Sequence, residues 1–188
     1  MTSRVRAAAG PDLKCRVRPA AAADVEPVAA LFLACWRSYS SFLPRSAIDA
    51  FDEARAVELW RRAIAEAPAG ESVLVADDRE LGVVGIVRFG TDPDEKGAGH
   101  VFSLYVHPAT HGLGIGRALM RRAAAGLRRS GMSGATLWVF AANERARSFY
   151  ERAGWRPDGA TRVEAGFGEP EVRLRRGLHG AGDRSSPG

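Results

Sequence analysis

The stretch that decides the fold is LYVHPATHGLGIGRALM, residues 104–120. A β-rich run ends at Pro108, three glycines follow within residues 112–116, and a helix-forming segment comes next. Glycines at such a place let the backbone curl tightly and aim successive free N–H groups at one point. That point lies at the positive end of the helix dipole, so the segment predicts a turn that binds phosphate.

Two common phosphate loops are excluded by the residues of this turn. The dinucleotide-binding fingerprint needs a third glycine where Arg117 stands, and a Walker loop needs a Gly-Lys-Ser/Thr sequence that the turn lacks. Arg117, Arg121 and Arg122 lie in or near the first turns of the helix and can add cationic contacts to a phosphate. A solvated helix face is the alternative explanation of these arginines, and the sequence leaves both open.

A second informative stretch is LWVFAANERARSFYERAGW, residues 137–155, in which a β-rich run precedes a helical one. Asn143, Ala146 and Tyr150 are spaced so that, on a helix, all three project from one face. The small Ala146 leaves room for a ligand along that face. Phe149 points elsewhere, toward the expected core.

Together the two stretches resemble a known family. Residues 104–120 are similar to motif A of the GCN5-related N-acetyltransferases (GNAT), whose pattern is Gln/Arg-x-x-Gly-x-Gly/Ala after a strand, with His111 where Gln or Arg is usual. Residues 137–155 are similar to motif B, Asn-x-x-Ala-x-x-Phe-Tyr-x-x-x-Gly-Phe after a strand. The resemblance extends over nearly the whole folded chain. The family members that the chain resembles are uncharacterised and of actinobacterial type.

The resemblance implies an α/β fold with a mixed, mostly antiparallel central sheet, helices on both faces, and splayed strands before motifs A and B. It implies acetyl-CoA as the co-substrate, with the amides of the glycine turn on its pyrophosphate. The residues that it assigns to acetyl-CoA binding are Leu104, Tyr105, Val106, His111, Gly112, Leu113, Gly114, Ile115, Gly116, Arg117, Asn143, Ala146 and Tyr150. His111 contributes mainly its backbone in this scheme.

Acyl transfer from a thioester to an amine needs a polarised carbonyl, a neutral amine and a proton for the departing thiolate. The resemblance implies that the backbone N–H of Val106 polarises the carbonyl and that Tyr150 is the general acid. A phenol with a pKa of about 10 can protonate a thiolate whose conjugate acid has a pKa of about 8.5. A tyrosine packed with its hydroxyl satisfied locally is the alternative.

The general base is less well defined, because the strand before motif A carries no acidic residue. Relatives often place a glutamate there, where this chain has His100. By the two-residue period of a strand, His100 shares a face with Phe102, Leu104 and Val106, and an imidazole with a pKa of about 6.5 can accept a proton. A histidine that only packs explains the residue equally well, Ser103 is a weaker candidate, and a neutral amine needs only positioning.

Outward from these motifs, residues 13–177 are expected to form a single N-acetyltransferase domain between disordered tails at 1–12 and 178–188. Hydrophobic periodicity and turn residues predict its elements. The expected strands are Leu13–Arg18, Ser72–Ala76, Leu81–Phe89, His100–Val106, Ala135–Phe140, Thr161–Ala165 and Glu171–Arg175. The expected helices are one capped by Asp24 and reaching Trp36, one over Asp52–Ala67, one from the glycine turn to Ser130, and Asn143–Ala153, with a loop around Pro44.

Composition limits the class of protein. The chain has 188 residues, 27 Lys plus Arg against 22 Asp plus Glu, and 46% hydrophobic content, which fits one soluble domain. No apolar segment reaches the ~20 residues of a membrane span. Met1–Lys14 has no apolar core of a secretory signal, so a cytoplasmic location is expected.

Metal and nucleic-acid binding are not expected. Pro108 prevents a helix across His107 and His111, and Cys15 and Cys35 fit buried thiols rather than a disulfide or a zinc site. The arginines are spread over nearly the whole chain, whereas a nucleic-acid protein would cluster them on one element with interleaved aromatics.

The expected function is transfer of an acetyl group from acetyl-CoA to a primary amine of a small molecule or peptide, by direct attack in a ternary complex. The acceptor is expected to enter over the first two helices and the loop Ser38–Ile48. There Arg37, Tyr39 and Trp36 offer a wall for a carboxylate-bearing amine, or simply pack. A non-catalytic acyl-CoA-binding sensor module and a protein N-terminal or lysine acetyltransferase are the alternatives, and the resemblance also allows a homodimer.

Overall fold

The computed structural model describes residues 15–164 and 166–178, so the predicted tails lie outside the described residues apart from Leu178. The strands are β1 (Arg16–Pro19), β2 (Ser72–Asp78), β3 (Gly82–Thr91), β4 (Gly99–Val106), β5 (Gly134–Phe140), β6 (Arg156–Val163) and β7 (Pro170–Gly177). The α-helices are α1 (Val25–Arg37), α2 (Arg45–Asp49), α3 (Glu53–Ala65), α4 (Ile115–Arg129) and α5 (Glu144–Arg152). Short 3-10 helices lie at η1 (Ala22–Asp24), η2 (Ser38–Ser41) and η3 (Pro108–Thr110).

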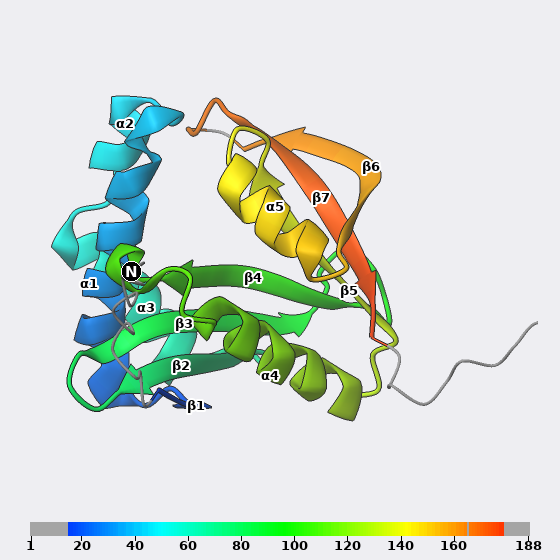
Figure 1. Cartoon of the computed structure of the whole chain (residues 1–188), viewed down its shortest axis with the longest axis horizontal. Coiled ribbons are helices and arrows are strands. Elements are labelled where there is room, and N and C mark those ends of the chain that lie inside the picture. The colour runs from blue at the N-terminus through cyan, green and yellow to red at the C-terminus, as the bar shows by residue number, and fades with distance from the viewer. Residues whose placement is uncertain (1–14, 165, 179–188) are drawn as a thin grey trace, which may run out of the picture.

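The strands form one sheet in the order β1-β2-β3-β4-β5-β7-β6 (Figure 1). Neighbouring strands are antiparallel except β4 and β5, which are parallel and join the two halves of the sheet. The β4–β5 pairing covers only Gly99–Val101 against Ala135–Leu137, and beyond it the two strands separate. The predicted mixed, mostly antiparallel sheet with a splay before both motifs is therefore confirmed.

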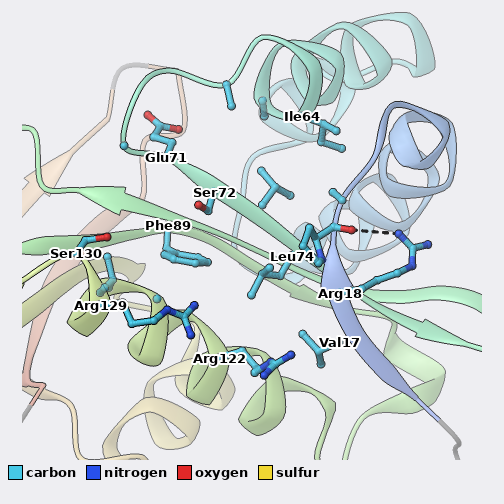
Figure 2. A pocket seen from close by; sticks show the side chains of 18 residues that line it. Val17, Arg18, Ile64, Glu71, Ser72, Leu74, Phe89, Arg122, Arg129 and Ser130 are labelled. Carbon is cyan, nitrogen blue, oxygen red and sulfur yellow. Dashed lines mark hydrogen bonds between the residues drawn. The ribbon is translucent and has the colours of Figure 1, made fainter. Parts of the chain in front are cut away.

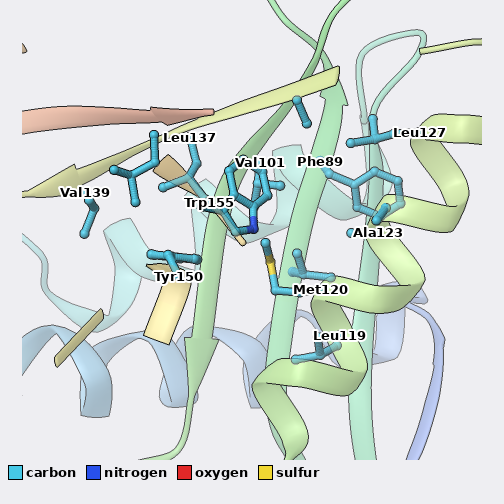
Figure 3. Close-up of a cluster of buried hydrophobic side chains, with 14 of the residues drawn as sticks. Phe89, Val101, Leu119, Met120, Ala123, Leu127, Leu137, Val139, Tyr150 and Trp155 are labelled. Carbon is cyan, nitrogen blue, oxygen red and sulfur yellow. The ribbon is translucent and has the colours of Figure 1, made fainter. Parts of the chain in front are cut away.

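Helices cover both faces of the sheet, as the sequence predicts. On one face α4 and α5 pack over a cluster in which Leu119, Met120 and Leu127 of α4 point toward the strands (Figure 3). On the other face α1 and α3 pack over a second cluster that includes Trp60. Side chains alternate along a strand, so adjacent residues of β3 belong to the clusters on opposite faces of the sheet. Ile86 faces α1 and Val87 faces α4.

Two glycines let α4 lie close to the sheet. A Cβ atom at Gly126 would lie 2.7 Å from a ring carbon of Phe89, and one at Gly99 would lie 2.7 Å from Leu127. Both distances are shorter than a side chain tolerates, so this approach requires glycine on the helix and on β4. The close packing fixes the direction of α4, and with it the position of the glycine turn at its N-terminus.

Asp24 does not cap α1 as predicted. Its carboxylate instead accepts a hydrogen bond from the backbone N–H of Ala21, at 2.8 Å, and pairs with Arg18, at 2.7 Å. The residue therefore stabilises the turn that precedes the helix. Asp52 caps α3 instead, since its side chain accepts from the N–H of Arg55 at the start of that helix.

Other boundaries also differ from prediction. The segment around Pro44 contains η2 and α2 rather than a plain loop. β6 begins at Arg156 rather than Thr161, because a register shift between Pro157 and Thr161 accommodates turn-like residues within the strand. Leu178, predicted to lie in the tail, is buried and donates a hydrogen bond to the Ser133 carbonyl at 2.7 Å. Within the described ranges, no helix is long and apolar enough to cross a membrane.

Candidate active site

The glycine turn connects β4 to α4 and has the conformation that the sequence predicts. Gly112 and Gly114 have φ values of 84° and 83°, in the left-handed region that favours glycine. Neither would bring a Cβ atom within 4 Å of another part of the chain, so the turn opens on free space. Gly114 directly precedes α4, and the first N–H groups of that helix have no partner within it. The turn can therefore hold an anion.

This turn opens on a cleft of about 1290 Å³ between α4 and α5. Its outer half is formed by the glycine turn, α4 and α5. Its inner end is formed by α1, η2 and the residue that follows η2, through Cys35, Ser38, Tyr39, Ser41 and Phe42. All the residues predicted to bind acetyl-CoA line the cleft except Leu113, which is exposed. The structure thus brings both sequence motifs to one site.

The backbone of β4 faces the gap between the splayed strands. The N–H of His107 donates to the Val84 carbonyl at 2.9 Å, and Val106 stands opposite Gly85. Hydrogen-bonded and non-bonded pairs alternate along an antiparallel ladder, so Val106 and Leu104 direct their N–H and C=O groups away from β3. These groups point toward β5, which has diverged, so the predicted polarising N–H of Val106 faces the gap.

His111 holds the glycine turn against the end of β4 through its side chain. Its Nε2 lies 2.9 Å from the Val106 carbonyl, so Nε2 carries the hydrogen and donates. Its Nδ1 is buried without a partner among the described residues. Burial, followed by the nearby Arg145 charge, lowers the pKa of His111 and keeps the ring neutral. The family resemblance implies a mainly backbone role at this position, and nothing in the sequence indicates this side-chain contact.

Asn143 and Phe149 shape the α5 side of the cleft. The Asn143 side chain accepts from the N–H of Ala146 at 3.1 Å and so caps α5. Phe149 packs against the main core cluster, as predicted, and a Cβ atom at Gly116 would lie 3.3 Å from its ring. The contact between Phe149 and Gly116 sets how closely α4 and α5 approach, and hence the width of the cleft.

Tyr150 lies on α5 with its ring buried against Phe149 and Trp155, at centroid distances of 5.2 and 6.2 Å. It lines the cleft, and its hydroxyl forms no hydrogen bond within residues 15–164 and 166–178. A hydroxyl satisfied locally, the alternative considered above, is therefore not found. Burial raises the pKa of Tyr150, so the phenol keeps its proton at neutral pH.

Three further groups gather near Tyr150. Tyr39 and Tyr105 line the cleft, and burial raises the pKa of both phenols. The Cys35 thiol donates to the Val106 carbonyl at 3.3 Å, and burial raises its pKa to about 12. The sequence predicts only a buried thiol at Cys35, because a single cysteine on an apolar helix face carries no sign of a cleft.

His100 is not brought to the cleft, and its predicted grouping with Leu104 and Val106 is wrong. A bulge at Phe102, where the β3–β4 register shifts, places His100 on the opposite face from Leu104. None of the cleft-lining residues described is His100 or Ser103. Both residues are therefore poorly placed to accept a proton from an amine in the cleft.

The His100 ring is held in a buried hydrogen-bonded chain. Its Nδ1 lies 2.6 Å from the Thr136 hydroxyl, which in turn donates to the Asp92 carboxylate. Thr136 is fully buried and Asp92 nearly so. Burial lowers the pKa of His100, so the ring is neutral in this chain. The contacts attach the loop after β3 to β5, which is the packing role that the sequence left open.

The arginines of α4 lie on two sides of the helix. This helix carries five arginines and no acidic residue. Arg117 and Arg121 line the cleft, as does Arg128, and none has an ion pair within the described residues. Arg122 faces a separate hollow of about 580 Å³ between β2 and α4, together with Arg129 (Figure 2). Of the three arginines predicted near a phosphate, two therefore face the cleft.

The predicted acceptor wall is only partly formed. Tyr39 lines the inner end, but Arg37 is exposed and does not line it. Trp36 is buried and its Nε1 donates to the Ala47 carbonyl at 3.1 Å. In the described ranges, no group of three or more His, Cys, Asp or Glu residues is arranged to hold a metal ion.

Comparison with proteins of known sequence places the two motifs in context. The chain is 38% identical over 76 residues to a mycothiol acetyltransferase of Beutenbergia cavernae, covering 40% of this chain and 25% of that protein. It is 39% identical over 89 residues to a mycothiol acetyltransferase of Propionibacterium freudenreichii subsp. shermanii, covering 47% and 28%. The chain thus spans about a quarter of the length of these curated relatives.

Comparison with solved structures confirms the fold. The PaiA N-acetyltransferase of Thermoplasma acidophilum, solved in complex with coenzyme A, matches with a TM-score of 0.70 and 15% identity, over 88% of this chain and 99% of that one. The family model described as "Acetyltransferase (GNAT) family" matches residues 28–155, which include the glycine turn, both motifs and most of α1. The chain therefore belongs to the GNAT acetyltransferase family.

Proposed function

We propose that the protein transfers an acetyl group from acetyl-CoA to a primary amine by direct attack in a ternary complex. One observation carries the proposal. The glycine turn, the gap-facing N–H of Val106 and the unpartnered hydroxyl of Tyr150 all open on one cleft. The glycine turn suits the phosphates of acetyl-CoA, and the Val106 N–H and the Tyr150 hydroxyl suit its thioester.

The cleft fits acetyl-CoA on its own chemistry. The left-handed glycines leave open space beside the free N–H groups at the α4 N-terminus, and Arg117 and Arg121 add unpaired positive charge. Leu104 then offers its backbone N–H and C=O along the gap and Val106 offers its N–H, so that an amide-containing arm can pair as an added strand would. A solved relative of this fold is described as a coenzyme A complex.

Bound acetyl-CoA supplies an activated acetyl group, and residues of the chain act on the reaction around it. As the amine nitrogen bonds to the carbonyl carbon and the carbon–sulfur bond breaks, Val106 stabilises the oxyanion through its N–H. Tyr150 donates its proton to the departing thiolate and then regains a proton from water, so the products are the N-acetyl amine and coenzyme A thiol. His100 is not among the described residues that line the cleft, so it is not available as a base. The cleft therefore only positions the neutral amine, which releases its extra proton to water after attack.

Binding is the first test of the proposal. Acetyl-CoA at 100 times its Kd should stabilise the folded protein by about 2.7 kcal/mol, and raise Tm by several degrees at about 2–4 °C per kcal/mol. ATP and NAD at the same concentration should leave Tm unchanged, because the turn lacks the features of their loops. Thiol release dependent on an added amine then tests transfer. Equal stabilisation by all three compounds would refute a specific acetyl-CoA site.

A sensor that holds acyl-CoA without turnover is the second candidate. It is favoured by the inner end, where the described lining residues include no carboxylate and no histidine to act as a base. It predicts coenzyme binding with no amine-dependent thiol release, and one good acceptor would refute it. The chain matches the mycothiol acetyltransferases over less than half of its own length, so these relatives do not indicate its acceptor.

A further inference from the structure

The inner end of the cleft carries no charged side chain among the residues that the structure describes. The described residues of α1 and η2 that line it are Cys35, Ser38, Tyr39, Ser41 and Phe42. The charged lining residues all belong to the outer half or its edge: Arg117, Arg121, Arg128, Glu144, Arg145, Arg152 and Arg176. A co-substrate with several phosphates matches the outer half, so the acceptor is left with the uncharged end.

Aromatic rings form the wall of this inner end. The rings of Tyr39 and Phe42 lie 5.3 Å apart, and Phe42 lies 5.8 Å from Phe140 on β5. Behind them Phe140 contacts Phe167, at 5.8 Å, and Phe167 contacts Trp36, at 5.4 Å. Because each ring packs against the next, the wall presents the rings of Tyr39 and Phe42 to the cleft.

A buried carboxylate behind this wall, that of Glu171, already has a charged partner. Glu171 stands opposite Phe140 in the β5–β7 pairing and is buried. The guanidinium of Arg162 donates to its carboxylate at 2.6 Å. A carboxylate or phosphate on the acceptor would therefore be desolvated without a partner from this pair. An ammonium group approaching the cleft is, in contrast, attracted by aromatic faces.

We infer that the acceptor is a primary amine with an aromatic or bulky aliphatic body and no carboxylate or phosphate beside the amine. This inference rests on the proposed acetyl transfer and narrows it. The body lies against Tyr39 and Phe42, and the amine points toward the part of the cleft that Val106 and Tyr150 line. The sequence-based expectation of a carboxylate-bearing amine depends on Arg37, which the structure leaves outside the cleft.

A matched set of amines tests the inference. Thiol release is measured with acetyl-CoA and 2-phenylethylamine, phenylalanine, phenylalaninamide or ethanolamine, at equal concentrations of neutral amine. We expect kcat/KM for 2-phenylethylamine and phenylalaninamide to exceed that for phenylalanine by at least about tenfold, because only phenylalanine places an unpaired carboxylate in the site. We expect ethanolamine to be about tenfold worse than 2-phenylethylamine, because it has no ring to bury.

The outcomes separate this inference from the proposed function. A preference for phenylalanine or ethanolamine, with normal acetyl-CoA binding, overturns the acceptor class and leaves acetyl transfer standing. Acetyl-CoA binding with no turnover of either uncharged aromatic amine overturns the acceptor class and favours the sensor. Absence of acetyl-CoA binding, measured by calorimetry, overturns the proposed function and the inference with it.

Two variants at the inner end give an independent test. Phe42→Ala should lower kcat/KM for 2-phenylethylamine by about tenfold, Phe42→Leu should restore much of it, and the Kd of acetyl-CoA should stay within about twofold in both. Ser41→Arg, on the exposed part of η2, supplies the missing positive charge and should raise the rate with phenylalanine relative to phenylalaninamide by several-fold. An unchanged ratio in a folded Ser41→Arg protein contradicts the inference.

Discussion

The outer half of the cleft and its inner end differ in charge and in how the sequence builds them. The outer half comes from two continuous stretches, the glycine turn with α4 and the start of α5, and it carries unpaired arginines. The inner end comes from α1 and η2, backed by rings of β5 and of the segment between β6 and β7, and its lining is uncharged.

The difference separates two kinds of recognition. A phosphate-bearing co-substrate can be held by backbone amides and a helix terminus, which a short local sequence specifies. An apolar amine is selected by a surface that exists only when distant elements pack together. Substitutions in the outer half should therefore change acetyl-CoA binding, whereas those at the junction of the two halves should change turnover.

The largest effect is expected at the junction, from Tyr150→Phe. Loss of a general acid lowers kcat by about 10²–10⁴-fold. The ring contacts with Phe149 and Trp155 remain, so the Kd of acetyl-CoA should stay within about twofold of the wild-type value. Stopped-flow detection of free thiol measures the step. The same change at neighbouring Tyr105 is the matched control, and a large loss there with none at Tyr150 would move the acid role to Tyr105.

A smaller effect, on binding, is expected from Gly114→Val. The left-handed φ of 83° disfavours a β-branched residue by about 1–2 kcal/mol, so the turn distorts and acetyl-CoA affinity should fall about tenfold or more. Gly131→Val is the control, because Gly131 has a φ of 82° just beyond the other end of α4 and open space around it. Calorimetry should show weaker binding only in the first variant. Equal losses in both would mean that helix stability, not the turn, controls binding.

The two sides of α4 give a third, more modest contrast. Arg117→Ala and Arg121→Ala should each weaken acetyl-CoA binding by about fivefold, corresponding to about 1 kcal/mol for a solvent-screened charge. The effect should shrink as salt rises toward 1 M, where the screening length is about 3 Å. Arg122→Ala and Arg129→Ala remove the same charge from the side that faces the other hollow, and they should leave the Kd unchanged (Figure 2). A similar loss of acetyl-CoA affinity in all four variants would indicate only that the general positive charge of α4 attracts the phosphates.

The sequence predicts the outer half well because its signals are local. The left-handed turn follows from glycines at 112 and 114, and the common face of Asn143, Ala146 and Tyr150 follows from helical spacing. The element order and the splayed sheet follow from periodicity and from the family resemblance.

What the sequence misses depends on long-range contacts or on one irregular residue. The bulge at Phe102 reverses the two-residue period, so His100 falls on the wrong face for the predicted base. Nothing local indicates that the Cys35 thiol and the His111 ring both contact the Val106 carbonyl. The ring wall behind Phe42 likewise depends on Phe140 and Phe167, which are far away in sequence.

His100→Gln should therefore have the smallest effect on turnover and a clear effect on stability. The variant disturbs the buried contact with Thr136, so the free energy of unfolding at pH 7 should fall by about 1 kcal/mol. Because His100 lies outside the described lining of the cleft, kcat/KM should change by no more than about twofold, and its pH profile should keep its shape. Loss of one limb of that profile would instead return His100 to the base role.

The pH dependence of stability also tests whether His100 has a buried structural role rather than the role of a general base. Burial lowers the pKa of folded His100, whereas in the unfolded chain a histidine has a pKa of about 6.5. As pH falls through about 6.5 toward the lowered folded value, the unfolded state binds more protons, so the wild-type protein loses stability. Glutamine does not titrate, so the His100→Gln variant should lose stability less steeply than the wild-type protein between about pH 7 and pH 5. Part of the remaining dependence of stability on pH comes from His111, whose pKa is also lowered. Urea unfolding at several pH values measures both slopes, and parallel slopes would mean that His100 is not held neutral by the buried chain with Thr136 and Asp92.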